Sequence, residues 1–265
     1  MPRFCANISL LFTEVALPER FDAAARAGFQ AVEIQFPYAF EPGMLAQRAR
    51  AAGVEVVLIN MPAGNLRAGD RGIGCLPSRA AEFREGVRLA RDYARSLQCR
   101  KLNCLSGIAP RDADAAELRE TFVANIRHAT QALERDAIEV LIEPQNTRTF
   151  PGIFLQHTGQ ALAIIDEVGA SNLRLQYDLF HMQIMEGDLA RTLEAHLERI
   201  GHVQIADVPE RHEPGTGEIN FTYLFGWLDR LGYSGWVGAE YAPAGPTEAG
   251  LAWARPYLHP RQEKQ

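Results

Sequence analysis

The sequence contains no run of about eighteen apolar residues, the length that a membrane-spanning helix needs. It also lacks blocks of about five like charges, and its formal net charge is −6. Proteins that bind nucleic acids neutralise phosphates and therefore need a clustered basic surface. We expect neither a membrane nor a nucleic acid as the main partner, whereas a local basic pocket for a small anion is compatible with this charge.

Cysteine is scarce, and no two cysteines form a C-x-x-C pair. The four cysteines are spread along the chain, at Cys5, Cys75, Cys99 and Cys104. Residues 1–11 hold one arginine and a short apolar run, without the cleavage site or the apolar length of an export signal. We therefore expect a cytoplasmic protein whose cysteines are reduced and buried.

The sequence does contain a regular alternation of two kinds of segment. Short apolar, β-branched runs predict strands at residues 3–9, 31–35, 55–59, 101–105, 139–143, 173–178, 202–206 and 236–241. Longer amphipathic runs predict helices at residues 18–27, 44–52, 78–97, 115–135, 159–168, 189–200, 223–231 and 247–257. Pro18 and Ser78 suit first helical turns. Glycines stand where helices would end, at positions 28, 53, 169 and 232.

Eight strand–helix units without a linker between them predict one parallel sheet. The 265 residues, 47% of them hydrophobic, match the roughly 250 residues of a (β/α)₈ barrel, or TIM barrel. We therefore predict a single α/β TIM-barrel domain over residues 1–265, with its core at about residues 3–258. An open, doubly wound sheet is the alternative, although such sheets seldom reach eight regular units.

Polar residues stand at the ends of four successive predicted strands, where TIM barrels carry their chemistry. These residues are Glu143, Asp178, Gln204 and Glu240. Their separations of 35, 26 and 36 residues are close to the roughly 30 of one strand–helix–strand unit, so the four side chains can point to a common centre. Three carboxylates so placed repel unless a cation neutralises them, and this oxygen-rich set favours Mg²⁺ or Mn²⁺ over zinc. Ordinary solvated or salt-bridged residues are the alternative.

Several segments of the chain resemble the hydroxypyruvate isomerases. This family is a branch of the xylose isomerase-like barrel superfamily, which also contains endonuclease IV and the ketose 3-epimerases. The similar segments extend from the first predicted strand to the last: residues 4–12 (FCANISLLF), 60–64 (NMPAG), 71–77 (RGIGCLP), 141–144 (LIEP), 176–187 (QYDLFHMQIMEG), 202–207 (HVQIAD), 213–220 (EPGTGEIN) and 235–241 (GWVGAEY).

The resemblance implies an isomerase that interconverts hydroxypyruvate and tartronate semialdehyde through an enediolate. It makes Glu143 and Glu240 the acid/base pair, and it puts both glutamates, Asp178 and Gln204 in metal-ligand positions for Mg²⁺ or Mn²⁺. Ketose epimerases have histidine where this chain has Gln204, so the ligand here would be an amide oxygen. The similar 2-oxo-tetronate isomerases are one alternative. An endonuclease IV-like phosphodiesterase is another, but it needs a cluster of zinc-binding histidines, and this chain has only seven histidines.

A small hydroxy-carbonyl acid also needs a positive partner for its carboxylate. Arg71, after the third predicted strand, and Arg211, after the seventh, are the candidates, because an arginine fork matches two carboxylate oxygens. His181, in the loop that leaves the sixth strand, is a candidate donor to substrate oxygens. Lys101 begins its strand and is expected to be structural, and residues 213–220 could cover the mouth of the barrel. Solvated residues or a plain turn are the alternatives, and the sequence carries no signal for an oligomeric state.

Overall fold

The computed structural model describes residues 1–258, and eight parallel strands form a closed barrel in chain order. The strands are β1 (Arg3–Asn7), β2 (Ala31–Ile34), β3 (Glu55–Asn60), β4 (Lys101–Cys104), β5 (Glu139–Ile142), β6 (Leu173–Asp178), β7 (Ile200–Ile205) and β8 (Trp236–Ala239). The last strand pairs with the first, with Arg3 opposite Trp236 and Ala6 opposite Ala239. The predicted TIM barrel is therefore confirmed, and the open sheet is excluded.

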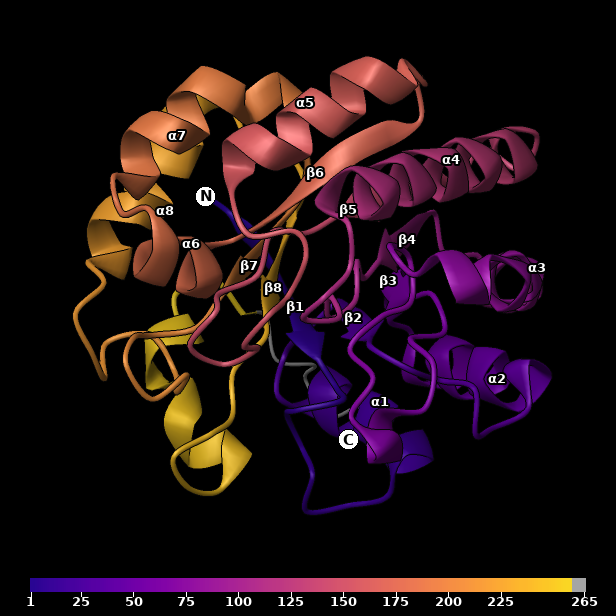
Figure 1. Ribbon diagram of the computed structural model, residues 1–265. Coiled ribbons are helices and arrows are strands. Elements are labelled where there is room, and N and C mark those ends of the chain that lie inside the picture. The colour runs from indigo at the N-terminus through magenta and orange to yellow at the C-terminus, as the bar shows by residue number, and fades with distance from the viewer. Residues whose placement is uncertain (259–265) are drawn as a thin grey trace.

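Helices surround this barrel on its outside (Figure 1). The α-helices are α1 (Leu17–Arg26), α2 (Pro42–Ala52), α3 (Ala80–Leu97), α4 (Ala115–Glu134), α5 (Thr158–Val168), α6 (Leu179–Met185), α7 (Leu189–His196) and α8 (Phe221–Leu231). Segments of 3₁₀ helix are η1 (Leu66–Ala68), η2 (Pro77–Arg79), η3 (Leu197–Arg199) and η4 (Thr247–Ala254). Among the described residues, no helix has both the length and the apolar character that crossing a membrane would require.

Most of the predicted helix ends agree with the structure. Pro18 lies in the first turn of α1. Gly53, Gly169 and Gly232 follow α2, α5 and α8 in the left-handed conformation, which suits glycine because it has no Cβ atom. The prediction for Ser78 is wrong, since this residue lies within η2 and no side chain caps α3.

Three helix predictions differ from the structure. Residues 247–257 do not form an α-helix, because the chain is a 3₁₀ helix over Thr247–Ala254. The predicted helix at residues 189–200 ends at His196, and Ile200 already belongs to β7. Helix α6 was not predicted, so His181 lies on a helix rather than in a loop. The side chain of Asp178 caps this helix, which is why it can begin directly after β6.

Strand side chains alternate between the helical layer and the barrel interior. On β7, Val203 and Ile205 belong to the large hydrophobic core, whereas His202 and Gln204 are buried polar residues of the interior. Near the amino-terminal ends of the strands, the interior is filled by an apolar cluster of Cys5, Ala31, Val57, Leu58 and Leu141. Toward the carboxyl ends the interior is polar, with buried Asn7, Glu33, Asn103, Gln176, Asp178 and Gln204. This polar layer positions the candidate site.

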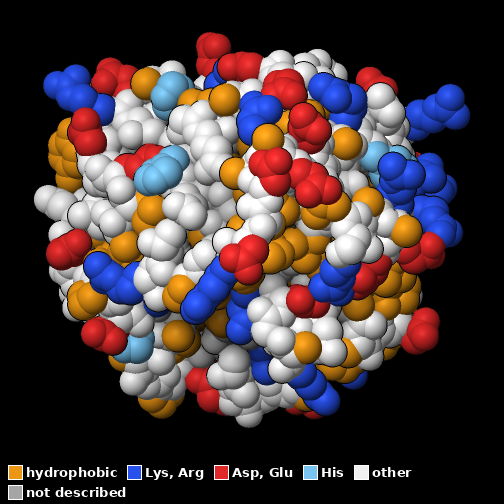
Figure 2. Space-filling view, viewed as in Figure 1, with side chains coloured by type: hydrophobic (Ala, Val, Ile, Leu, Met, Phe, Trp, Pro, Cys, Tyr) orange, Lys and Arg blue, Asp and Glu red, His pale blue; other side chains and the backbone are white. Residues whose placement is uncertain are grey.

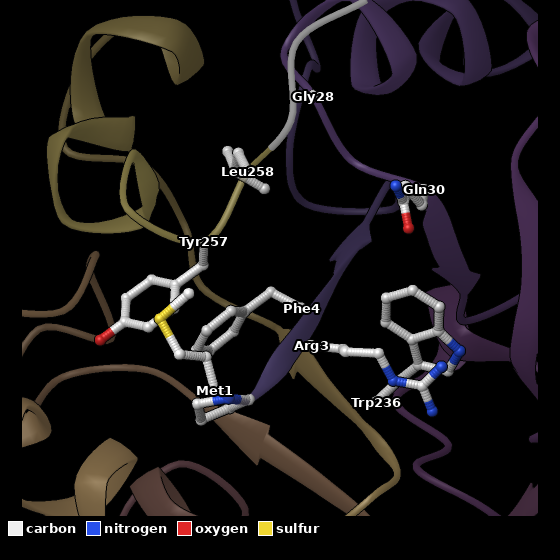
Figure 3. Close-up of a pocket in the computed structure, with 9 residues that line it drawn as sticks. Met1, Arg3, Phe4, Gly28, Gln30, Trp236, Tyr257 and Leu258 are labelled. Carbon is white, nitrogen blue, oxygen red and sulfur yellow. The ribbon is translucent and has the colours of Figure 1, made fainter. Parts of the chain in front are cut away.

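A hollow of about 280 Å³ lies at the amino-terminal end of the barrel (Figure 3). Its charged side chain is Arg3, whose guanidinium lies 4.6 Å from the centre of the Trp236 ring and donates to the carbonyl oxygen of Ser234. No acid, histidine or cysteine belongs to the described lining of this hollow. Its described lining therefore offers no carboxylate or imidazole for acid/base chemistry, and the candidate site lies at the opposite end.

Candidate active site

Three buried side chains converge at the carboxyl ends of β5 and β6. The Nε2 atom of His181 lies 3.5 Å from Oδ2 of Asp178 and 3.9 Å from Oε1 of Glu143. Ligand atoms of all three residues lie within 4.8 Å of one another. These three atoms are buried and have no hydrogen-bond partner within the described chain. The unpaired carboxylate oxygens of Glu143 and Asp178 fit a divalent cation, because burying them otherwise has a large cost in free energy.

The ring of His181 is oriented by Asn146. The backbone N–H of Asn146 lies 3.2 Å from Nδ1 of His181, and its side-chain amide lies 2.6 Å from the same atom. A backbone N–H can only donate, so Nδ1 must accept and Nε2 carries the proton of the neutral ring. Burial, together with nearby Arg211, lowers the pKa of His181 well below its usual range. His181 is therefore a neutral hydrogen-bond donor at Nε2 rather than a metal ligand.

Glu143 stands directly after β5, where the chain leaves the barrel interior. Its Oε2 atom accepts a hydrogen bond of 2.8 Å from the side chain of Asn103 on β4. Burial, with the negative charges of Glu240 and Asp178, raises the pKa of the Glu143 carboxyl well above its usual range. One oxygen is thus fixed by Asn103, while the other faces Asp178 and His181.

Glu240 follows β8 and is held by three donors. Its Oε1 atom accepts from Gln35 at 2.8 Å and from Asn7 at 3.1 Å, and its Oε2 atom pairs with Nη2 of Arg211 at 2.5 Å. Burial raises the pKa of Glu240 to about 7; Arg211 opposes this shift, whereas Asp178 adds to it. A carboxyl with this pKa can both hold and release a proton near neutral pH.

Arg211 lies among the carboxylates and not alone at the mouth of the barrel. Besides its contact with Glu240, its Nη2 atom is 3.6 Å from Oδ2 of Asp178. The guanidinium is 5.1 Å from the centre of the Phe180 ring, and its backbone has a left-handed φ of 58°. The sequence interpretation expects Arg211 to hold the carboxylate of a substrate, whereas the structure places its guanidinium beside Glu240 and Asp178, where it offsets part of their negative charge.

The loop that carries Arg211 is organised by Asp207, a residue that the sequence interpretation missed. Oδ2 of Asp207 accepts from the backbone N–H groups of Gly215 and Gly217, both at 2.9 Å. Oδ1 accepts from Val208 and Ile219, both at 3.0 Å. A single buried carboxylate therefore fixes the whole turn. Residues 213–220, which the sequence suggested as a cover for the mouth of the barrel, are not among the described residues that line the cavity at this end.

Gln204 points into the polar interior, beside the residues of the cluster. It pairs with Asp178 in the register of β6 and β7. Its Nε2 atom donates to Oε1 of Glu33 at 2.8 Å, and its Oε1 atom accepts from Gln176 at 2.6 Å. The side-chain amide is therefore held on both sides, with its nitrogen toward Glu33.

A cavity of about 320 Å³ opens beside these groups. Glu143, Glu240, Arg211 and Arg71 all contribute to its lining, together with apolar Leu10, Phe36, Leu66, Leu105 and Phe150. The Arg71 guanidinium lies 5.9 Å from the centre of the Phe150 ring and donates to the carbonyl oxygens of Leu66 and Asp70. Two acids and two arginines in one small cavity suit a short anionic molecule that is to gain or lose protons.

Lys101 lies at the other end of the barrel, as expected from its place at the start of β4. Its ammonium group donates to the carbonyl oxygen of Gly201 and lies 3.7 Å from Oε2 of Glu139. Its contacts join the start of β4 to the starts of β5 and β7, so the prediction of a structural role agrees with the structure.

Comparison with known proteins relates the whole chain to one family. The family model described as xylose isomerase-like TIM barrel matches residues 21–257. Hydroxypyruvate isomerase of Escherichia coli strain K12 is 48% identical, over 97% of this chain and 100% of that protein. The 2-oxo-tetronate isomerase of Cupriavidus necator is 46% identical, over 97% of this chain and 99% of that protein.

A similar solved structure has a different description. It is a crystal structure described as an AP endonuclease of family 2 from Brucella melitensis, with 47% identity and a TM-score of 0.96. The match covers 98% of this chain and 100% of that one. The family model describes a barrel and the relatives are described as isomerases, whereas the description of this solved structure names another activity.

Proposed function

Since the chain belongs to the xylose isomerase-like TIM barrel family, we propose that it is an isomerase that interconverts hydroxypyruvate and 2-hydroxy-3-oxopropanoate, also called tartronate semialdehyde. The resemblance that the sequence indicated is confirmed at the level of this family. The observation that carries the proposal is the pair Glu143 and Glu240, two buried acids with raised pKa values at one cavity.

The reaction moves a proton between neighbouring carbons. A base takes a proton from the CH₂OH carbon, and the keto oxygen gains a proton, which gives an enediol or its enediolate anion. The hydroxyl on the terminal carbon then loses its proton while the neighbouring carbon gains one, which leaves an aldehyde beside CHOH. Glu143 and Glu240 take and return these protons, and such acid/base help contributes about 10²–10⁴-fold to the rate.

His181 supports the same reaction as a donor. Its Nε2–H faces Asp178 and Glu143, at the place where negative charge would develop on a substrate oxygen. A neutral imidazole donor can stabilise that charge without becoming a competing acid. Arg71 and Arg211 bind the carboxylate of the substrate, since both line the cavity and both offer a planar fork of donors.

A divalent cation, Mg²⁺ or Mn²⁺, completes this proposal. Glu143 and Asp178 would hold it, since one buried oxygen of each is unpaired; Glu240 and Gln204, the other two predicted ligands, would have to exchange hydrogen bonds from Arg211 and Gln176 for the cation. When bound, the cation supplies Lewis-acid stabilisation of the substrate's carbonyl and hydroxyl oxygens. The unpaired ligand atoms of Glu143 and Asp178 are carboxylate oxygens, and His181 already carries a proton at Nε2, which favours Mg²⁺ or Mn²⁺ over zinc.

Proton exchange with solvent tests this function. Hydroxypyruvate is incubated in D₂O with the metal-supplied protein and followed by NMR. We expect tartronate semialdehyde to form and deuterium to enter the recovered substrate, because an enediolate exchanges its proton before it collapses. A direct hydride shift would give product without solvent label, and an absence of product would contradict the proposal.

The four-carbon acid is the nearest alternative substrate, because the relative from Cupriavidus necator has 46% identity and is a 2-oxo-tetronate isomerase. The same NMR assay with 2-oxo-tetronate separates the two by their kcat/KM values. The small cavity and the larger identity to the hydroxypyruvate enzyme support the three-carbon acid as the better substrate.

A nuclease is the other alternative, because of the description of the Brucella structure. Acidic and basic side chains are interspersed over the face shown in Figure 2, and the formal net charge is −6. Such a surface does not favour a DNA backbone. Incubation with a duplex that contains an abasic site should leave the duplex intact.

The four buried cysteines, none in a disulfide, also support our proposal that the enzyme works in the reducing cytoplasm.

A further inference from the structure

Glu33 lies in the middle of β2, below the candidate site, and sequence interpretation did not select it. The residue is fully buried. Its Oε1 atom accepts from Asn7 at 2.9 Å and from Gln204 at 2.8 Å. Its Oε2 atom lies 2.7 Å from Nε2 of His202 and 3.7 Å from the thiol of Cys5. A buried carboxylate is stable only when such partners surround it, so Glu33 is an ordered hub of the barrel interior.

One bond of Glu33 determines the orientation of Gln204. A side-chain amide can turn by half a rotation and exchange its oxygen and nitrogen at almost no change in shape. A carboxylate oxygen that has no proton accepts only, so Glu33 admits the NH₂ group of Gln204 and rejects its oxygen. The amide oxygen of Gln204 must therefore face away from Glu33, toward the side where Gln176 donates to it at 2.6 Å.

A second bond links Glu33 to Glu240 through Asn7. The NH₂ group of Asn7 has two hydrogens, of which one is directed to Glu33 at 2.9 Å and the other to Oε1 of Glu240 at 3.1 Å. The orientation of this amide is fixed as well, because its oxygen accepts from the backbone N–H of Ser9 at 3.1 Å. Asn7 thus holds two carboxylates at a constant separation.

We propose that Glu33 is a positioning residue, whose carboxylate fixes the side-chain amide of Gln204 with its oxygen turned away from Glu33 and, through Asn7, holds one oxygen of Glu240. This inference rests on the proposed function, since it gives those two side chains a common support beneath the reaction site. Gly238 leaves the space for it, because a Cβ atom at that position would lie 2.4 Å from Oε2 of Glu33.

A metal site at Cys5, Glu33 and His202 is the competing interpretation, because ligand atoms of these residues lie within 4.8 Å of one another. Both oxygens of Glu33 already accept hydrogen bonds there, and two of the donors are the amides of Asn7 and Gln204. A cation bound to Glu33 would have to repel or displace these NH₂ groups. The hydrogen-bond pattern therefore favours positioning over metal binding.

Three variants test the positioning role, with Mn²⁺ affinity measured by calorimetry and with kcat and KM for hydroxypyruvate. Glu33→Met keeps the length of the side chain but has no acceptor, and we expect at least tenfold weaker Mn²⁺ binding and at least tenfold lower kcat. Glu33→Gln keeps one amide oxygen that can accept from Asn7 and Gln204, and His202 can change tautomer so that its Nε2 accepts from the new NH₂ group. We therefore expect the Mn²⁺ affinity and kcat of this variant to stay within about threefold of wild type. Cys5→Ala is the matched control, which removes only the thiol contact and should leave both values within twofold even if Tm falls.

Each outcome decides the inference. A Glu33→Met variant with the Mn²⁺ affinity and kcat of the wild type would overturn the inference. Two Mn²⁺ ions bound per wild-type chain, against one per chain of Glu33→Met, would also overturn it, because Glu33 would then be a metal ligand. If Glu33→Met does not fold, Asn7→Leu decides, because it cuts the link to Glu240; an unchanged kcat in that variant would also overturn the role of Glu33. A wild-type chain that binds one Mn²⁺ but does not isomerise hydroxypyruvate contradicts the proposed substrate alone, and the Mn²⁺ comparison then still decides about Glu33.

Discussion

The Nη2 atom of Arg211 lies 2.5 Å from Oε2 of Glu240, so a loop residue and a strand-end acid from neighbouring βα units form a partly buried ion pair. Burial raises the pKa of Glu240 to about 7, and the guanidinium limits this rise. A base works only in its ionised form. Arg211 therefore keeps Glu240 partly ionised at neutral pH, in addition to its proposed contact with the substrate.

Replacing Arg211 should change the pH dependence of the reaction. In Arg211→Gln the opposing positive charge is lost, so the pKa of Glu240 rises further and less base is ionised at pH 7. We expect the acidic limb of the kcat/KM profile to move up by about one pH unit or more, a tenfold loss per unit at low pH. Arg211→Lys is the control, because it keeps the charge and should keep the limb near its wild-type position. An unmoved limb in Arg211→Gln would show that Glu240 is not the titrating base.

Arg71 should affect substrate binding and leave the chemical step unchanged. In Arg71→Ala the loss of one charged hydrogen bond to the substrate's carboxylate, worth about 1.5–3 kcal/mol, should raise KM roughly ten- to hundredfold with kcat unchanged. Arg67→Ala is the matched control, because Arg67 is an exposed arginine of the same loop. If Arg71→Ala and Arg211→Gln both keep KM within twofold of wild type, another group holds the carboxylate.

Replacing Glu143 should reduce activity and increase stability at the same time. The pKa of Glu143 is raised in the fold, so the folded protein holds a proton that the unfolded chain releases above about pH 4.5. Stability from this group is complete at lower pH and is lost as the pH rises through the folded pKa. Glu143→Gln cannot ionise, so the metal-free variant should have a higher Tm than wild type at pH 8 and a similar Tm near pH 4.5.

The same variant should lose at least about a hundredfold in kcat, because the amide cannot accept a proton. Thermal unfolding at the two pH values and turnover at pH 8 check both halves. A Glu143→Gln protein that is less stable than wild type at pH 8 would contradict the charge argument, and one with near-normal turnover would remove Glu143 from the acid/base pair.

Removal of divalent cations should suppress turnover, and Mg²⁺ or Mn²⁺ should restore it. A cation that binds the folded state alone also raises Tm, by an amount that grows with its concentration. We therefore expect Mn²⁺ to raise the Tm of chelator-treated protein, and to raise it less in Asp178→Asn, which loses one ionised ligand. Full activity in protein that contains no metal by elemental analysis would contradict this part of the proposal.

The sequence alone determined the barrel and the four strand-end residues. Hydrophobic periodicity is local, so eight apolar runs separated by amphipathic ones could be recognised without tertiary information. The alternation of side chains along a strand then predicted that residues such as Glu143 and Asp178 face the interior. Helix α6 could not be predicted in the same way, because Asp178 is both the last residue of β6 and the cap of the helix that follows, a combination without a separate sequence signal.

Only the tertiary structure decided how these groups are held. Glu33 meets His202 across 169 residues of chain, and Asn7 meets Glu240 across 233. Such contacts depend on the closure of the barrel and on side-chain directions within about an ångström, which no local pattern encodes. The same holds for Arg211, whose position between Glu240 and Asp178 follows from a turn fixed by Asp207. The sequence thus determines which strands end in acids, because that is set by local periodicity, whereas their charges, partners and pKa values are set by burial and by neighbours that only folding brings together.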